Sequence, residues 1–319
     1  MPHPFLDRDP TPEFQLRCVN VMRAWEGGTL NFTGAAEQLS ALKSEALARQ
    51  HAANQAYAEL LRGTLQMNRV SYDQSIRHFR DARELFEQVG NRECILICDM
   101  YMGESYRCKG ELDRARGVFR RAYATAKELK NRRSQLICRA QEGRVLFEMG
   151  QYQEAIPPLQ EAIQLSYTPT LLPDHTSTEI CAAYSDLALI YLEQGDPKAA
   201  LENARAAMYV AEEGKTLFSL GMANRTLGIV LSVVKAPSTG RLINPDDYFE
   251  AAAKYFRQLR AESELAHTAF AHGESLAKRR QKIEAATKFQ EALEAYTRLN
   301  MSNEAAKAND AYARMIRGS

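Results

Sequence analysis

The chain has 319 residues, 45% of them hydrophobic, enough to bury a substantial core in one elongated or two compact domains. Its 41 Lys and Arg residues nearly balance 40 Asp and Glu residues, so no global field attracts nucleic acid or an anionic membrane. The first residues, MPHPFLDRDPTPEF, lack the basic and apolar parts of a secretory signal, and no run reaches the roughly 18 apolar residues of a membrane span. We therefore expect a cytoplasmic protein with neither a nucleic-acid nor a membrane partner.

The stretch YMGESYRCKGELDRARGVFRRA, residues 101–122, contains a pattern of small and bulky side chains. Gly103 is followed by Tyr106, Ala115, Phe119 and Ala122, at offsets of 3, 12, 16 and 19 residues. Offsets 0 and 3 share one face of a first helix, and offsets 12, 16 and 19 share one face of a second. The pattern predicts an antiparallel helix pair in which small residues allow close approach and bulky ones fill the gaps.

The pattern recurs about every 40 residues along the chain. The first copy is degenerate, because Arg23 stands at the small-residue position before Ala35, Leu39 and Leu42. Later copies contain Gly63, Phe79 and Ala82; Gly143, Ala155 and Ala162; Ala188, Tyr191 and Ala200; Gly228 and Phe256; and Gly273, Phe289 and Ala292. In the sixth copy Ala252, Phe256 and Leu259 arrive about twelve residues late, which predicts a loop inserted at 235–247.

This repetition predicts seven helix pairs in a single superhelical domain over 14–300, after an N-terminal extension at 1–13. The expected pairs span 14–50, 51–89, 91–130, 131–170, 176–213, 215–260 and 261–299. The segment 166–178, with two prolines, is a second long linker. A last helix at 303–317, within the terminal stretch 301–319, would cover the exposed end of the array.

These residues resemble the tetratricopeptide repeat (TPR), although the period exceeds the 34 residues of its common form. The longer repeat is similar to those of the partner-of-Inscuteable family, kinesin light chains and the sensor arms of bacterial signal-transduction ATPases. The resemblance implies an all-α fold, a right-handed α-solenoid of about seven TPR-like helix pairs with a C-terminal capping helix. The matched positions are all packing positions, so the resemblance says more about fold than about function.

Motifs for chemistry are missing from the sequence. EGKTLF at 213–218 resembles part of a phosphate loop, but the required upstream glycine is replaced by Tyr209. The six cysteines and six histidines show no zinc-site spacing, and no Gly-x-Ser-x-Gly motif is present. We therefore expect no enzyme, no cofactor and no metal, with the cysteines as free thiols.

In TPR proteins the first helix of each pair lines a concave surface, so the resemblance points to binding residues on that helix. The candidates are Asn68, Tyr101, Glu104, Gln141, Arg144, Met222, Ile229 and Val233. The Lys/Asn clamp of chaperone-binding TPRs is absent, because Leu60, Thr64 and Asn68 replace it in the second copy. Met222, Ile229 and Val233 form an apolar stripe that suits a helix or an extended peptide, unless loop 235–247 folds back over it.

Three functions remain open at this point. The first is a non-catalytic scaffold that binds a protein or peptide partner in its concave groove. The second is a regulatory arm, similar to peptide-responsive quorum-sensing receptors, that senses a peptide or small ligand and controls a regulator in trans. The third is a repeat protein that positions a catalytic partner.

Overall fold

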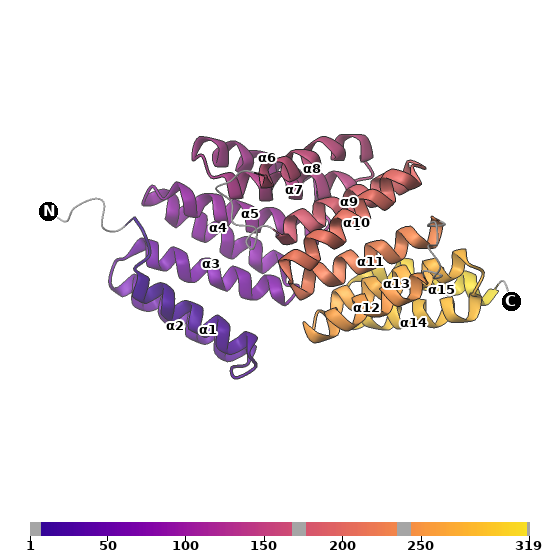
Figure 1. Ribbon diagram of the computed structural model, residues 1–319. Coiled ribbons are helices and arrows are strands. Elements are labelled where there is room, and N and C mark those ends of the chain that lie inside the picture. Colours follow the sequence, from indigo (N-terminus) through magenta and orange to yellow (C-terminus); the bar gives the residue numbers. More distant parts are fainter. Residues whose placement is uncertain (1–7, 168–176, 235–243, 318–319) are drawn as a thin grey trace. The chain divides into compact units, whose positions relative to one another are not determined.

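A computed structural model of the chain describes residues 8–167, 177–234 and 244–317. Within these ranges the chain forms fifteen α-helices and no strand, which confirms the all-α prediction (Figure 1). Most of the predicted loop 235–247 and of the linker 166–178 lies outside the described residues. The chain divides into two compact units, Met1–Met149 and Gly150–Ser319, and each is described by itself.

Unit 1 contains three complete helix pairs and the first helix of a fourth. Its helices are α1 (Pro12–Glu26), α2 (Phe32–Ala48), α3 (Ala52–Asn68), α4 (Tyr72–Gln88), α5 (Arg92–Cys108), α6 (Leu112–Glu128) and α7 (Arg132–Glu148). Consecutive helices pack against each other, as in an α-solenoid. A single domain over 14–300 stays a prediction.

Unit 2 continues the same arrangement of paired helices. Its helices are α8 (Tyr152–Ser166), α9 (Ser177–Glu193), α10 (Pro197–Gly214), α11 (Leu217–Val233), α12 (Pro245–Gln258), α13 (Glu262–Lys278), α14 (Lys282–Arg298) and α15 (Ser302–Arg317). The terminal helix α15 packs its buried Ala308 and Ala311 against apolar side chains of α13 and α14. Among the described residues, no helix is long and apolar enough to cross a membrane.

The helix ends follow from local sequence. The Asn91 side chain caps α5 by accepting a hydrogen bond from the Cys94 N–H at 2.9 Å, and Asn131 caps α7 by accepting one from the Ser134 N–H at 3.0 Å. Gly110 has a φ of +83°, a left-handed conformation that ends α5 and that glycine adopts at little cost. The 17-residue helices α5 and α7 therefore begin at capping side chains supplied by their own sequence.

The small and bulky positions of the repeat meet at the centre of each pair. A Cβ atom built on Gly63 would lie 2.5 Å from Cε1 of Phe79, whose side chain is fully buried. The same contact joins Gly103 to Phe119 and Gly273 to Phe289. The alanines of the pattern are also fully buried: Ala82, Ala115, Ala122, Ala155, Ala162, Ala188, Ala200 and Ala292. Glycine is therefore required where the phenyl ring lies on the helix backbone.

Two copies differ from the sequence interpretation. In the sixth, Phe249 rather than Phe256 lies against Gly228, while Phe256 packs on Gly221. Phe249 follows Gly228 by 21 residues, whereas Phe79 follows Gly63 by 16, so the delay is five residues rather than twelve. In the first copy Arg23 is exposed, because α1 turns Phe14, Cys18, Val21 and Met22 inward instead.

Candidate functional site

Five of the candidate binding residues belong to the first helices of unit 1, and we call their surface the first-helix face: Asn68, Tyr101, Glu104, Gln141 and Arg144. Helix α5 contacts both α3 and α7, so these residues lie on neighbouring helices. Asn68 is exposed, Tyr101 is 37% exposed, and the other three are half-buried. This part of unit 1 leaves polar and aromatic atoms at its surface.

Tyr101 is held in place by the core beneath it. Its ring stacks on Phe79, with the ring centroids 5.4 Å apart and the planes 16° from parallel. Phe79 in turn lies on Gly63. Burial raises the pKa of Tyr101, so its hydroxyl stays protonated at neutral pH. That hydroxyl makes no hydrogen bond within the described part of the chain, which leaves a fixed aromatic ring with an available donor.

Glu104 belongs to an ion-pair network between α5 and α7. Arg107 donates to both Glu104 oxygens, at 2.9 Å from Nε and 2.6 Å from Nη2, and its Nη1 donates to Glu148 at 2.5 Å. Burial alone would raise the pKa of Glu104, but Arg107 and the nearby Arg144 lower it to about 2. Glu104 is therefore ionised at neutral pH and bound to its own chain.

Gln141 contributes the least satisfied polar atom of the face. Its side-chain oxygen, Oε1, is buried and accepts no hydrogen bond from the described residues. A buried acceptor without a donor costs about 1–3 kcal/mol. Gln141 Oε1 is therefore an unpaired acceptor that lies just beneath the first-helix face.

The apolar candidates in unit 2 occupy a different environment. Met222 is only 4% exposed and lies in a core cluster with Cys181 of α9 and Phe256 of α12. Ile229 is half-buried, and Val233, at the end of α11, is 51% exposed. Helix α11 packs directly against α9 and α13, so the predicted stripe is partly covered by neighbouring first helices. Whether loop 235–247 covers the rest lies largely outside the described residues.

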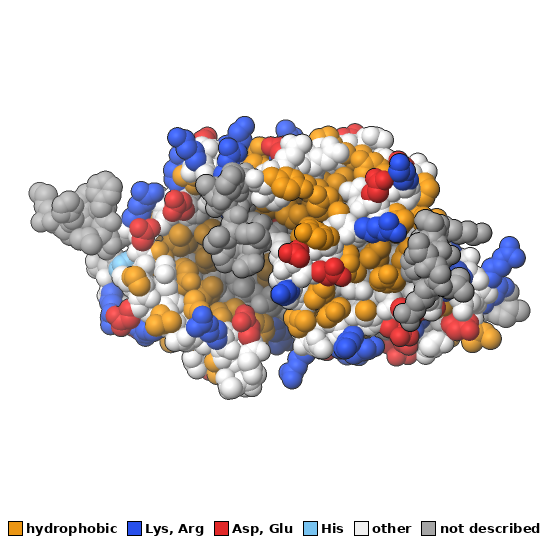
Figure 2. Space-filling model, viewed as in Figure 1, with side chains coloured by type: hydrophobic (Ala, Val, Ile, Leu, Met, Phe, Trp, Pro, Cys, Tyr) orange, Lys and Arg blue, Asp and Glu red, His pale blue; other side chains and the backbone are white. Residues whose placement is uncertain are grey.

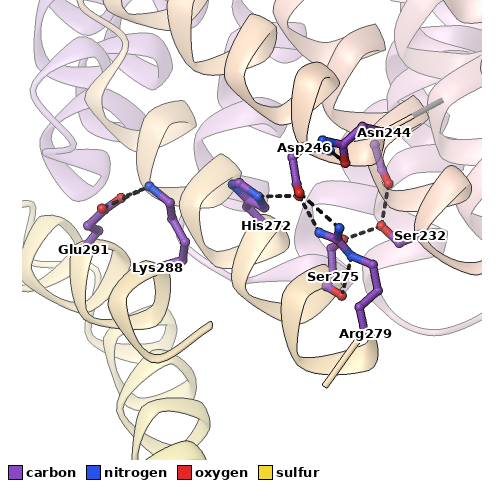
Figure 3. A network of polar contacts seen from close by, with 9 residues as sticks. Ser232, Asn244, Asp246, His272, Ser275, Arg279, Lys288 and Glu291 are labelled. Carbon is purple, nitrogen blue, oxygen red and sulfur yellow. Dashed lines mark hydrogen bonds and ion pairs between the residues drawn. The ribbon is translucent and has the colours of Figure 1, made fainter. Parts of the chain in front are cut away.

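Two polar clusters have no counterpart in the sequence analysis. In unit 2, Asp246 at the start of α12 accepts a hydrogen bond from His272 of α13, at 2.8 Å, and one from Nη1 of Arg279, the C-cap residue of α13, at 3.0 Å (Figure 3). The His272 ring also stacks on Phe249, with centroids 4.7 Å apart. These hydrogen bonds connect the first turn of α12 to α13 and its C-terminal end. Its members are far apart in sequence and form no local motif.

The second cluster surrounds Glu59 of unit 1, which is 1% exposed. Its carboxylate bonds Lys43, Arg62 at 2.9 Å and His78 at 2.7 Å. Glu59, His78 and Asp81 could offer three metal ligands within 4.8 Å of one another. Because Lys43 and Arg62 already neutralise the Glu59 carboxylate, the arrangement is that of an ion-pair network.

The described residues on the face drawn in Figure 2 form no extended area of one charge. Lys and Arg side chains alternate with Asp and Glu side chains over the visible face, with hydrophobic side chains between them (Figure 2). This agrees with the balanced composition and points to recognition by local contacts rather than by a strong field.

Comparisons with known proteins identify the repeat. The tetratricopeptide-repeat family matches residues 93–168 and again residues 180–213. No curated protein sequence matches the chain. Among solved structures, apo RapI shares 12% identity at a TM-score of 0.72, with 91% of this chain and 99% of RapI covered.

Two further structures share the fold. The apo quorum sensor NprR from B. thuringiensis is 13% identical at a TM-score of 0.61, covering 96% of this chain and 86% of that one. The Rap conjugation gene regulator of plasmid pLS20, solved with the Phr* peptide, is 16% identical at a TM-score of 0.55, covering 83% and 76%. The family models, the paired helices and the recurring glycine–phenylalanine contacts agree with one another. The chain therefore contains tetratricopeptide repeats, at residues 93–168 and 180–213, and folds as an array of long TPR-like helix pairs.

Proposed function

We propose that this chain is a non-catalytic TPR protein that binds a short peptide on the first-helix face of unit 1. The observation that supports this most directly is the buried Gln141 oxygen without a donor, on the helix next to the fixed ring of Tyr101. On binding, the Gln141 side chain would turn outward and its oxygen would accept a hydrogen bond from a peptide backbone N–H, while an apolar peptide side chain would pack on Tyr101. The pLS20 Rap regulator, which shares the fold, was solved with a peptide.

Binding should be tested with a phage-displayed library of eight-residue peptides selected on the full chain. The affinity of each selected peptide is then measured by fluorescence polarisation. Tyr101→Ala should weaken binding about 30-fold, because a buried aromatic anchor contributes about 2 kcal/mol. Gln141→Ala should weaken binding about fivefold, which corresponds to one hydrogen bond.

Stability measurements separate a binding role from a structural one. Gln141→Ala removes an unsatisfied buried acceptor, so the free energy of unfolding should stay constant or rise while affinity falls. Ile283→Ala is the matched control, because Ile283 lies on α14 in unit 2 and is 82% exposed. Selected peptides that bind both first-helix variants as tightly as the wild type would contradict the proposal.

A second candidate function is a sensor that controls a regulator in trans, and the shared fold with the quorum sensor NprR supports it. A sensor must change conformation when its ligand binds. Small-angle X-ray scattering with a selected peptide distinguishes the two functions. A smaller radius of gyration in the complex supports the sensor, and an unchanged radius supports the scaffold.

A further inference from the structure

A groove of about 490 Å³ runs over α11 between α10 and α12 of unit 2. We call it the tyrosine groove, because Tyr209 of α10 and Tyr248 and Tyr255 of α12 line it together with Met208 and Leu231. Tyr248 and Tyr255 are seven residues apart, so both lie on the same face of α12. The groove is therefore formed by one side-chain stripe from each of three packed helices.

The residue types in this groove are those of a protein interface. Tyr209 is 66% exposed, and tyrosine, methionine and arginine are enriched where proteins meet. A larger groove of about 800 Å³ lies between α12 and α14, but alanine, lysine and glutamate predominate in its lining. Those three types are depleted at interfaces, so composition rather than volume distinguishes the tyrosine groove.

Two charges on α10 indicate what the groove can hold. Arg205 and Glu212 both line it, both are exposed, and neither forms an ion pair or side-chain hydrogen bond with the described residues. They are seven residues apart, which is two helical turns or about 10 Å, and Tyr209 lies between them. An occupant complementary to this rim would present an acid and a base at the same separation, on either side of an apolar side chain.

We propose that the tyrosine groove docks one amphipathic helix of a protein partner. The acid of that helix faces Arg205, and its base, seven residues later, faces Glu212. Large apolar side chains between them enter the groove toward Met208 and Leu231. The order of acid before base also agrees with the macrodipole of the partner helix, whose N-terminal end favours negative side chains. This inference does not depend on peptide binding by the first-helix face.

The test uses a displayed library of 14-residue amphipathic helices with fixed leucines on one face. The flanking positions are randomised among Asp, Glu, Lys, Arg and Ala, and selection is carried out on the full chain. We expect the selected helices to have an acid seven residues before a base. Failure to enrich any helix, or enrichment without this charge order, would overturn the proposal.

Variants then show whether the selected helices occupy the groove. Tyr209→Ala should weaken binding at least tenfold, because it removes an exposed aromatic anchor without opening the core. The double variant Arg205→Glu with Glu212→Arg should prefer helices in which the base precedes the acid. Ile283→Ala, which also shortens an exposed apolar side chain of unit 2, should bind like the wild type.

The competing occupant is the chain's own segment 235–243, which joins α11 to α12. A variant in which a Gly-Ser linker of equal length replaces residues 235–243 tests this. If helices bound that variant but not the unaltered chain, the segment itself would be the occupant of the groove. Binding by the unaltered chain that is lost in Tyr209→Ala supports a partner helix. Binding that Tyr209→Ala and the charge exchange leave unchanged would refute it.

Discussion

Replacing Gly63 by alanine should destabilise unit 1, although alanine is the better helix former. The gain in helix propensity is about 1 kcal/mol. Against it, the new Cβ would lie 2.5 and 2.6 Å from two ring atoms of Phe79. That ring is fully buried and lies under Tyr101, so it has little room to move. Overpacking of this kind costs up to about 3 kcal/mol, which leaves a net loss of about 2 kcal/mol.

Gly117→Ala is the matched control in the same unit. Gly117 also lies inside a helix, α6, but the nearest atom to its added Cβ is the flexible end of Arg121, at 3.6 Å. This substitution should therefore stabilise the chain by up to about 1 kcal/mol, the propensity gain alone. The two glycine substitutions are expected to have opposite signs.

Urea unfolding followed by tryptophan fluorescence measures both effects. Trp25 is the single tryptophan of the chain and packs against the core of unit 1, so its emission reports on that unit. With a slope of about 2 kcal/mol/M, Gly63→Ala should lower the midpoint by about 1 M. Adding Phe79→Leu to Gly63→Ala should recover part of the loss, since the smaller side chain leaves room for the Cβ. A midpoint for Gly63→Ala that rises as in Gly117→Ala would refute the reasoning.

Two further predictions concern the charged clusters. Glu59→Gln should lower the free energy of unfolding by about 3 kcal/mol in a urea titration, because it leaves Lys43 and Arg62 beside a buried neutral amide. Burial raises the pKa of Glu59, but His78, Lys43 and Arg62 outweigh it and lower the pKa to about 2. The stabilisation by the wild-type carboxylate should therefore be constant above about pH 5 and be lost as the pH falls toward 2. An equal stability of both proteins at pH 7 would contradict this. Burial lowers the pKa of His272. As the pH falls, this imidazole therefore takes up a proton in the unfolded chain before it does in the folded chain, so the free energy of unfolding should decrease below about pH 6.5. Circular dichroism melts between pH 5 and 8 should show that slope in the wild type and a shallower one in His272→Gln.

The fold could be predicted because the packing of each helix pair requires particular residue types at a fixed spacing in the sequence. A phenyl ring that lies on a helix backbone requires glycine at one position and a bulky residue 16 positions later, as at Gly103 and Phe119. After the inserted segment, the sequence pattern alone did not decide which phenylalanine packs on Gly228. Phe249 and Phe256 are seven residues apart on one face of α12, so either could have matched Gly228, and only the paired helices show that Phe249 does.

The polar clusters could not be predicted, because their members lie on different helices. Glu59 and His78 are 19 residues apart, and no spacing rule links an acid on one helix to a base on the next. The burial of Met222 has a similar cause. The exposure of Met222 depends on how closely α9 approaches α11, and the repeat period in the sequence does not predict that distance.

Packing residues and a candidate binding residue nevertheless meet at one point, where Gly63, Phe79 and Tyr101 form a single stack. A Cβ at Gly63 displaces the Phe79 ring, and Tyr101, which rests on that ring, must follow. Gly63→Ala should therefore weaken peptide binding several-fold in conditions where unit 1 remains folded, although residue 63 touches no ligand. Fluorescence polarisation with a peptide selected on the wild type measures this, with Gly117→Ala as the control. Unchanged affinity in a folded Gly63→Ala protein would show that the position of Tyr101 does not depend on the packing below it.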